Sequence, residues 1–214
     1  MPTRTPSAQQ SVCQFAEVIV LRDGSPALLR AIRPDDRERL QTAFLALEPE
    51  SVYLRYFTSK HKLTEADLDR LCQPDFVERV VLLVTVGSGA GEIIVGSGGY
   101  VTQTSSGGAR SAELAFAVAD KFQGQGFACK LLGVLTDIAR QAGIQRFDAV
   151  VLAQNAPMLK VLRRSGLPIC QLPEKDGVVS LTLALIAVRP DKDLHLADPE
   201  LRSPTAQAIA EGPS

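Results

Sequence analysis

The sequence predicts an α/β fold of the α+β type, in which helices flank a mixed, mostly antiparallel central sheet. Apolar strand-like runs alternate with stretches of helical periodicity between residues 17 and 188. Turn signals separate the first two runs and the last two, which indicates antiparallel hairpins at both ends. One long helical stretch joins two neighbouring strands near residue 130, and such a crossover makes those two strands parallel.

The N-terminal half should contain a hairpin followed by three short helices. Asp23 and Gly24 are hairpin turn residues between the first two apolar runs. Pro34 suits the first turn of a helix, where its missing N–H costs nothing, and Thr64 is a typical N-cap residue. The expected elements are strands at 17–21, 27–32, 80–86 and 93–102, and helices that begin at Pro34, Pro49 and Thr64.

The C-terminal half should contain the crossover helix and a closing hairpin. Phe127, Leu131, Leu135 and Ile138 fall on one helical face, which predicts an amphipathic helix packed on the sheet. The remaining expected elements are strands at 112–118, 147–152, 169–172 and 178–186, a helix at 157–164 and a turn at 175–177.

A glycine-rich turn opens the crossover helix and is the most informative segment for function. It consists of Gln123, Gly124, Gln125, Gly126, Phe127 and Ala128. Such a turn points several backbone N–H groups at one spot on the positive end of a helix dipole, where a phosphate can bind. The dinucleotide fingerprint is not met, because Ala128 stands where its third glycine could fall. The Gly-Lys-Ser/Thr sequence of triphosphate loops is also absent.

Composition limits the classes to which the chain can belong. Its 214 residues carry 23 basic and 24 acidic side chains, and a net charge of −1 argues against a general nucleic-acid or membrane-surface binder. No apolar run approaches the roughly 20 residues that span a bilayer. The four cysteines lack metal-ligand spacing, so we expect no metal and a cytoplasmic protein with reduced thiols. The expected organisation is a flexible segment at 1–16, one domain at 17–188 and a flexible tail at 189–214.

The strand order, the glycine turn and a downstream segment around Asn155 together resemble the GNAT superfamily of acyl-CoA-dependent N-acyltransferases. Its pyrophosphate motif, Gln/Arg-x-x-Gly-x-Gly/Ala, is matched by Gln123, Gly126 and Ala128. Four stretches look closer still to the acetyltransferase domain of bacterial Pat-type protein-lysine acetyltransferases. They lie at 29–36, 50–57, 112–118 and 152–159.

The resemblance implies an N-acetyltransferase that moves an acetyl group from acetyl-CoA to a protein lysine or a small amine, by direct transfer in a ternary complex. The two parallel strands would splay apart to admit the co-substrate. Backbone N–H groups from Gln123 to Ala128 would hold the CoA diphosphate. The pantetheine arm would pair with the backbone of Phe116, Ala117 and Val118 like an added strand, and Asn155 would hydrogen-bond it.

Glu113 is the candidate catalytic base. A lysine-like amine is mostly protonated at pH 7, so a carboxylate acting through water must remove its proton before attack. Glu113 interrupts an otherwise apolar strand, and it matches the acid that the Pat-like resemblance implies. The alternative is a structural acid at a strand end, exposed or paired with Arg110. Glu92 is a second candidate base. Arg55 is expected to pair with Asp35 or Asp36, and the alternative is that it lines the substrate cleft.

One departure from the family pattern keeps a second hypothesis open. Many members carry a tyrosine that protonates the leaving thiolate, four residues before a glycine that here is Gly166. Leu162 occupies that position, so no acid is available from it. A catalytically weak acyl-CoA-binding or interaction module is therefore the alternative to an enzyme, and a generic nucleotide-binding domain is a third. A homodimer through edge strands stays open.

Overall fold

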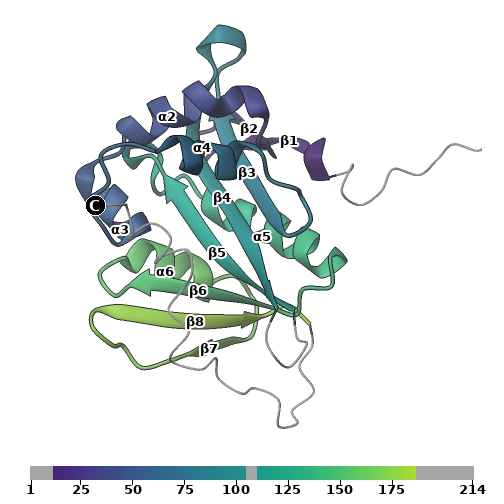
Figure 1. The fold of residues 1–214 in the computed structure, drawn as a ribbon, viewed down its shortest axis with the longest axis vertical. Helices are drawn as coiled ribbons and strands as arrows, with labels where there is room; N and C mark the ends of the chain where they lie inside the picture. Colours follow the sequence, from purple (N-terminus) through teal and green to yellow (C-terminus); the bar gives the residue numbers. More distant parts are fainter. Residues whose placement is uncertain (1–11, 105–109, 187–214) are drawn as a thin grey trace, which may run out of the picture.

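A computed structural model of the protein describes residues 12–104 and 110–186 (Figure 1). Within these ranges eight strands form one sheet in the order β1-β2-β3-β4-β5-β6-β8-β7. Neighbouring strands are antiparallel except for β5 and β6, so the predicted mixed sheet with a parallel pair is confirmed. The strands are β1 (Ala16–Val20), β2 (Pro26–Ala31), β3 (Arg79–Val86), β4 (Ile93–Thr104), β5 (Arg110–Val118), β6 (Arg146–Leu152), β7 (Ile169–Gln171) and β8 (Val178–Ala184).

The helices also begin where the sequence signals place them. Pro34 starts a short 3-10 turn, η1 (Pro34–Asp36), which leads directly into the first α-helix. The Thr64 hydroxyl accepts a hydrogen bond from the Asp67 N–H at 3.2 Å and caps the third. The α-helices are α2 (Arg37–Leu45), α3 (Pro49–Tyr56), α4 (Glu65–Cys72), α5 (Phe127–Gln141) and α6 (Ala156–Arg163), and the other 3-10 turns are η2 (Gly89–Gly91) and η3 (Asp120–Phe122).

The sheet separates two apolar cores, which gives the molecule three layers. Alternate side chains of a strand point to opposite faces. In β3, Val80, Leu82 and Val84 therefore pack on one side, while Val81 and Leu83 pack on the other. Helices α5 and α6 cover the first face, and α2, α3 and α4 cover the second.

Glycine in β4 sets how closely α5 approaches the sheet. A Cβ atom on Gly96 would overlap the Phe127 ring, and one on Gly98 would lie 2.8 Å from the Phe116 ring. Because these positions carry no side chain, the first turn of α5 rests directly on the strand. The N-terminus of α5 is thereby fixed next to the end of β5.

A buried ion-pair cluster joins β2, η1 and the loop before β4. The guanidinium of Arg30 donates two hydrogen bonds of 2.7 Å to the carboxylate of Asp36, and both side chains are fully buried. It also donates to Glu92 at 3.1 Å. The predicted pairing of Arg55 with Asp35 or Asp36 is not found: its guanidinium lies over the Tyr56 ring, and the residue lines a cleft, as the alternative had it.

The predicted flexible segments lie largely outside the described residues, as does the middle of the loop between β4 and β5. The domain limits of 17 and 188 therefore stay a prediction. In the described part of the chain, no helix is long and apolar enough to cross a membrane.

Candidate active site

The glycine turn presents a row of unused backbone donors at the start of α5. Gly124 and Gly126 both have positive φ angles, 77° and 89°, which favour glycine. The N–H groups from Gly124 through Ala128 find no hydrogen-bond acceptor among the described residues, whereas the next one, of Cys129, donates to the Gly126 carbonyl at 3.2 Å. Five consecutive donors at the positive end of a helix dipole can bind a phosphate.

A cleft of about 140 Å³ lies beside this turn. The end of β5 and the turn form one wall, and α3 and the start of α6 form the other. All ten residues predicted to bind the co-substrate line this cleft, namely Phe116, Ala117, Val118, Gln123, Gly124, Gln125, Gly126, Phe127, Ala128 and Asn155. The structure thus brings together residues from two strand ends and one turn.

The cleft lies where β5 and β6 part. The two strands are paired only at Ser111 with Arg146, Ala112 with Phe147 and Glu113 with Asp148. Beyond these pairs they fan apart toward α3 and α6 (Figure 1). The backbone of β5 from Leu114 onward is therefore paired with β4 on one side and lacks a partner strand on the other.

Glu113 lies at the last pair before the strands part. Its neighbours Ala112 and Leu114 point into the core under α5, so Glu113 points to the opposite face, where α3 packs against β5. The side chain is half-buried, and its Oε2 accepts a hydrogen bond from Gln103 Nε2 at 3.1 Å. It does not line the cleft itself and lies about 10 Å along the strand from Phe116.

The structure gives little support to two alternatives, the pairing of Glu113 with Arg110 and the use of Glu92 as the base. Arg110 and Glu113 are three residues apart on one strand and so point to opposite faces. The guanidinium of Arg110 bonds to Glu78 at 2.8 Å and to the Ala142 carbonyl at 2.8 Å. Glu92 is bound by Arg30 as described above, so it is a poor candidate for the second base.

Sequence reasoning missed Asp148, the acid directly opposite Glu113 in the parallel pair. Its carboxylate accepts hydrogen bonds from the Thr182 hydroxyl at 2.9 Å and from Arg146 Nε at 3.4 Å. A polar residue inside the apolar run of β6 was the available signal. Only the strand register shows that two carboxylates meet where the strands part.

Asn155 and Leu162, which the sequence singled out, both lie in or next to α6. Asn155 is the N-cap of this helix, and its side-chain oxygen accepts the Met158 N–H at 3.1 Å. This leaves the amide nitrogen as the donor that can face the cleft. Leu162 is buried in the core beneath α6, so a hydrophobic contact replaces the tyrosine acid of many family members.

Asp120 connects the turn to the opposite wall of the cleft. It accepts hydrogen bonds from the Glu48 N–H at 3.0 Å and the Ser51 hydroxyl at 2.5 Å, both at the start of α3. It also accepts one from Gln123 Nε2 at 3.2 Å. The first residue of the turn and the N-terminus of α3 are therefore held by the same carboxylate.

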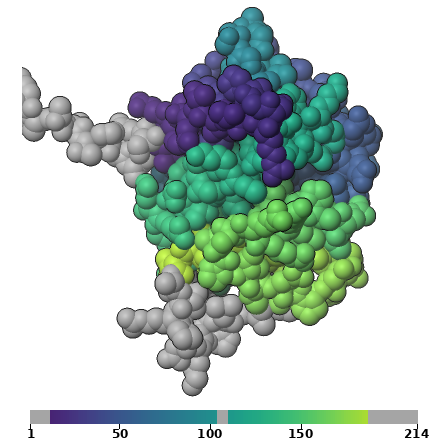
Figure 2. Space-filling model, turned by 180° about the vertical axis from the view of Figure 1, so that it is seen from behind, coloured from purple at the N-terminus to yellow at the C-terminus, as the bar shows by residue number. Residues whose placement is uncertain are grey.

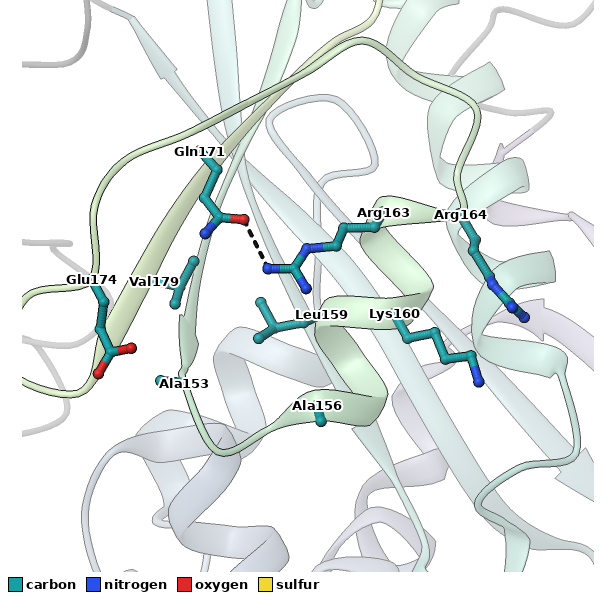
Figure 3. Close-up of a pocket in the computed structure, with 9 residues that line it drawn as sticks. All are labelled: Ala153, Ala156, Leu159, Lys160, Arg163, Arg164, Gln171, Glu174 and Val179. Carbon is teal, nitrogen blue, oxygen red and sulfur yellow. Dashed lines mark hydrogen bonds between the residues drawn. The ribbon is translucent and has the colours of Figure 1, made fainter.

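A larger cavity of about 550 Å³ lies elsewhere, between α6 and the end of the sheet formed by β8 and β7 (Figure 3). Arg163 reaches across it to Gln171, whereas Lys160 and Arg164 point away from that contact. None of the predicted site residues lines it. Its charged side chains do not converge, so we place the candidate site in the smaller cleft. Among the described residues no group of His, Cys, Asp and Glu is arranged to hold a metal.

Comparison with known proteins is consistent with this geometry. A family model described as the GNAT acetyltransferase domain matches residues 27–168. The acetyltransferase Pat of Mycolicibacterium smegmatis is 34% identical over 161 residues, which are 74% of this chain and 47% of that protein. The crystal structure of the GNAT domain of S. lividans PAT is 34% identical, with a TM-score of 0.71 over 85% of this chain and 99% of that one.

A structure from Salmonella typhimurium with its cofactor acetyl-CoA shares the fold at 20% identity, with a TM-score of 0.60 over 77% of this chain and 98% of that one. The chain spans about half the length of the curated Mycolicibacterium relative. Its similarity to the S. lividans structure, by contrast, covers that whole domain.

Proposed function

The chain belongs to the GNAT acetyltransferase family, and on this premise we propose that it transfers an acetyl group from acetyl-CoA to a primary amine. The observation that carries the proposal is the row of five backbone N–H groups from Gly124 to Ala128, which lack acceptors among the described residues. Most of this turn is at least partly exposed, so in the free protein water can satisfy these donors, and an anionic ligand can replace that water. The diphosphate of acetyl-CoA would supply the acceptors.

The unpaired side of β5 supports the same co-substrate. The backbone from Leu114 to Val118 has no partner strand toward β6. The pantetheine arm carries two amides and can pair with such an edge as an added strand does. Ala115 and Ala117 share the face of Glu113, so small side chains separate the cleft from the carboxylate. The thioester would then lie near the point where the strands part.

Glu113 is proposed as the general base. The amine nitrogen forms a bond to the thioester carbonyl carbon, and its proton passes to the Glu113 carboxylate through water. The carbon–sulfur bond breaks, and its electron pair leaves with the CoA sulfur. The thiolate is a fair leaving group and can take its proton from solvent, which is consistent with Leu162 in place of a tyrosine.

The acceptor is proposed to be a protein lysine, with a small amine as the alternative. The support is the 34% identity to the acetyltransferase Pat of Mycolicibacterium smegmatis and to the GNAT domain of S. lividans PAT, compared with 20% to the Salmonella typhimurium structure. The proposal includes direct transfer in a ternary complex and a cytoplasmic location. It leaves open whether the protein forms a homodimer.

Binding of acetyl-CoA to the glycine turn is tested by thermal unfolding of wild type and Gly126→Glu. A ligand that binds only the folded state at 100 times its Kd should add about 2.7 kcal/mol to the free energy of unfolding. We expect this stabilisation with acetyl-CoA and its loss in the variant, because Gly126 has φ 89° and glutamate adds a negative charge at the proposed phosphate site. The matched control is Gly133→Glu, whose side chain would meet open space on α5.

Two outcomes would overturn the proposal. Stronger stabilisation by ATP or NAD than by acetyl-CoA would indicate a different nucleotide ligand. Binding without acetyl transfer to a lysine peptide or to small primary amines would favour the catalytically weak module. Comparing turnover on these two acceptors then separates the protein substrate from the small one.

A further inference from the structure

The β1–β2 hairpin packs on the glycine turn although 102 residues separate the two in sequence. The Arg22 N–H donates to the Gln125 carbonyl at 3.3 Å, and the Asp23 N–H donates to the Gln125 side-chain oxygen at 3.2 Å. In Figure 2 the purple N-terminal elements lie directly on the teal-green segment that contains α5. The tip of the hairpin is therefore held beside the row of N–H donors.

The side chain of Arg22 lies over Gly126. A Cβ atom on this glycine would be 3.4 Å from Arg22 Nε and 3.8 Å from its Cγ. Gly126 is favoured by its positive φ, and a side chain there would be in van der Waals contact with the arginine. The arginine stem and its charged group consequently cross the N-cap of α5.

The guanidinium of Arg22 makes no hydrogen bond or ion pair with any described residue. The acids nearby have other partners: Asp23 accepts hydrogen bonds from Ser25, and Glu17 pairs with Lys130 at 2.7 Å. No carboxylate is among the residues that line the cleft. An exposed cation without a carboxylate partner among the described residues is therefore held beside the N-cap of α5, adjacent to the turn where the anion is proposed to bind, although Arg22 does not itself line the cleft.

We propose that Arg22 binds the diphosphate of acetyl-CoA together with the backbone N–H groups of the turn. The inference rests on the proposed function and adds to it a side chain that the GNAT motif does not contain. A guanidinium forms paired, charge-assisted hydrogen bonds with phosphate oxygens, which a neutral amide cannot replace. The diphosphate rather than the 3′-phosphate is assigned because Arg22 lies at the N-cap residue itself.

The test is the affinity of Arg22→Gln for acetyl-CoA, measured by titration calorimetry and by steady-state kinetics. A hydrogen bond to a charged group corresponds to a loss of about 10- to 100-fold in affinity. We expect KM for acetyl-CoA to rise by that factor with kcat unchanged, because the diphosphate is bound equally before and during the reaction. Arg22→Lys should recover part of the affinity. The melting temperature of the free protein should not change, since only the backbone of Arg22 bonds to the turn.

The control variant is Arg70→Gln, which removes the same charge from α4, away from the cleft lining. The 3′-dephospho form of acetyl-CoA distinguishes the phosphates, and Arg22→Gln should weaken both ligands by the same factor. Unchanged affinity in Arg22→Gln, or a loss confined to the ligand with the 3′-phosphate, would overturn the inference and leave the proposed function intact. Failure of the wild-type protein to bind acetyl-CoA would overturn both.

Discussion

Two groups of charged side chains lie on the same face of the sheet but differ in burial and in the partners of their carboxylates. In the first group, the carboxylate of Asp36 in η1 is fully buried and accepts two hydrogen bonds from the guanidinium of Arg30 in β2. At β5, Glu113 is half-buried, one of its interactions is a hydrogen bond from the neutral amide of Gln103, and the pairing of β5 with β6 ends there.

The difference separates structural acids from reactive ones. A carboxylate that is buried with a guanidinium has its charge compensated within the fold and cannot readily accept a proton. A carboxylate at an opening between strands can exchange a proton with water or with a substrate. Strand pairing explains the contrast, because β2 is bonded to β1 and β3 along its length whereas β5 is bonded to β6 over three residues.

The largest expected effect is a loss of stability when the buried ion pair of Arg30 and Asp36 is broken. Arg30→Met leaves the buried carboxylate of Asp36 without its bidentate partner and with only Arg39, at 3.5 Å, as a cation; breaking a buried pair typically costs about 3–5 kcal/mol. We expect that decrease in the free energy of unfolding, measured by urea denaturation. The double variant Arg30→Met, Asp36→Leu should recover part of it, because the fully buried carboxylate is gone and only the partly exposed Glu92 has lost its partner. A loss below about 1 kcal/mol in the single variant would show that the pair is not structural.

The same pair should make the wild-type protein sensitive to acid. Burial raises the pKa of Asp36, but the hydrogen bonds from Arg30 and from the Arg33 N–H, together with the charges of Arg30 and Arg39, outweigh this, so its pKa in the folded state lies below the ordinary value of 3.8. The pair therefore contributes stability above that value and loses it as the pH falls toward the folded pKa. In the double variant this part of the acid-induced loss should be absent.

The second expected effect is a loss of turnover when Glu113, at the opening between β5 and β6, is changed. Glu113→Gln keeps the size and the hydrogen bonding of the side chain but removes the base, so kcat should fall by about 100-fold or more. KM for acetyl-CoA and the melting temperature should stay close to wild type. The deficit should shrink at high pH, because a lysine amine with a pKa of about 10.4 then loses its proton unaided.

Glu78→Gln is the matched control for this measurement. Glu78 pairs with Arg110 at the surface, so the same chemical change there should leave kcat unchanged. An unchanged kcat in Glu113→Gln would contradict the proposed base. A fall of equal size in both variants would indicate a general effect of charge.

The smallest effect comes from a buried polar group that has neither a charge nor a partner. The Tyr100 hydroxyl lies in the core and finds no hydrogen-bond acceptor among the described residues. Burial also raises its pKa to about 12, so the phenol stays neutral at ordinary pH. Tyr100→Phe should not lower the free energy of unfolding, because no hydrogen bond is lost and an unpaired hydroxyl no longer has to be buried. A loss of stability in thermal unfolding would show that the hydroxyl is bonded after all.

Local signals predicted most of the fold and the residues of the cleft. The hairpin turn at Gly24, the cap at Thr64 and the periodicity of α5 depend on neighbours within a few residues, so the sequence shows them directly. The cleft residues were predictable because the turn and the strand before it are consecutive in the chain. The family and its Pat-like relatives were also recognisable from four short stretches.

Contacts between distant segments could not be predicted. Arg30 lies 62 residues from Glu92, and only the order of strands brings them together. A sequence pattern does not show where a side chain points, so it could not reveal that Arg55 does not pair with Asp36. Glu113 lies opposite Asp148 because β5 and β6 pair in one particular register over three residues. Arg22 lies over Gly126 because the β1–β2 hairpin packs on the glycine turn.

The short seam between β5 and β6 also has a mechanical consequence. The sheet consists of two antiparallel parts, β1 to β5 and β6 to β8, which share one apolar core but pair with each other at only three residues. The crossover segment from Ala119 to Gln145 links them and carries the glycine turn. The cleft beside the turn is lined from both parts, by Phe116 at the end of β5 and by Asn155 after β6, so a molecule bound there would bridge the gap between them.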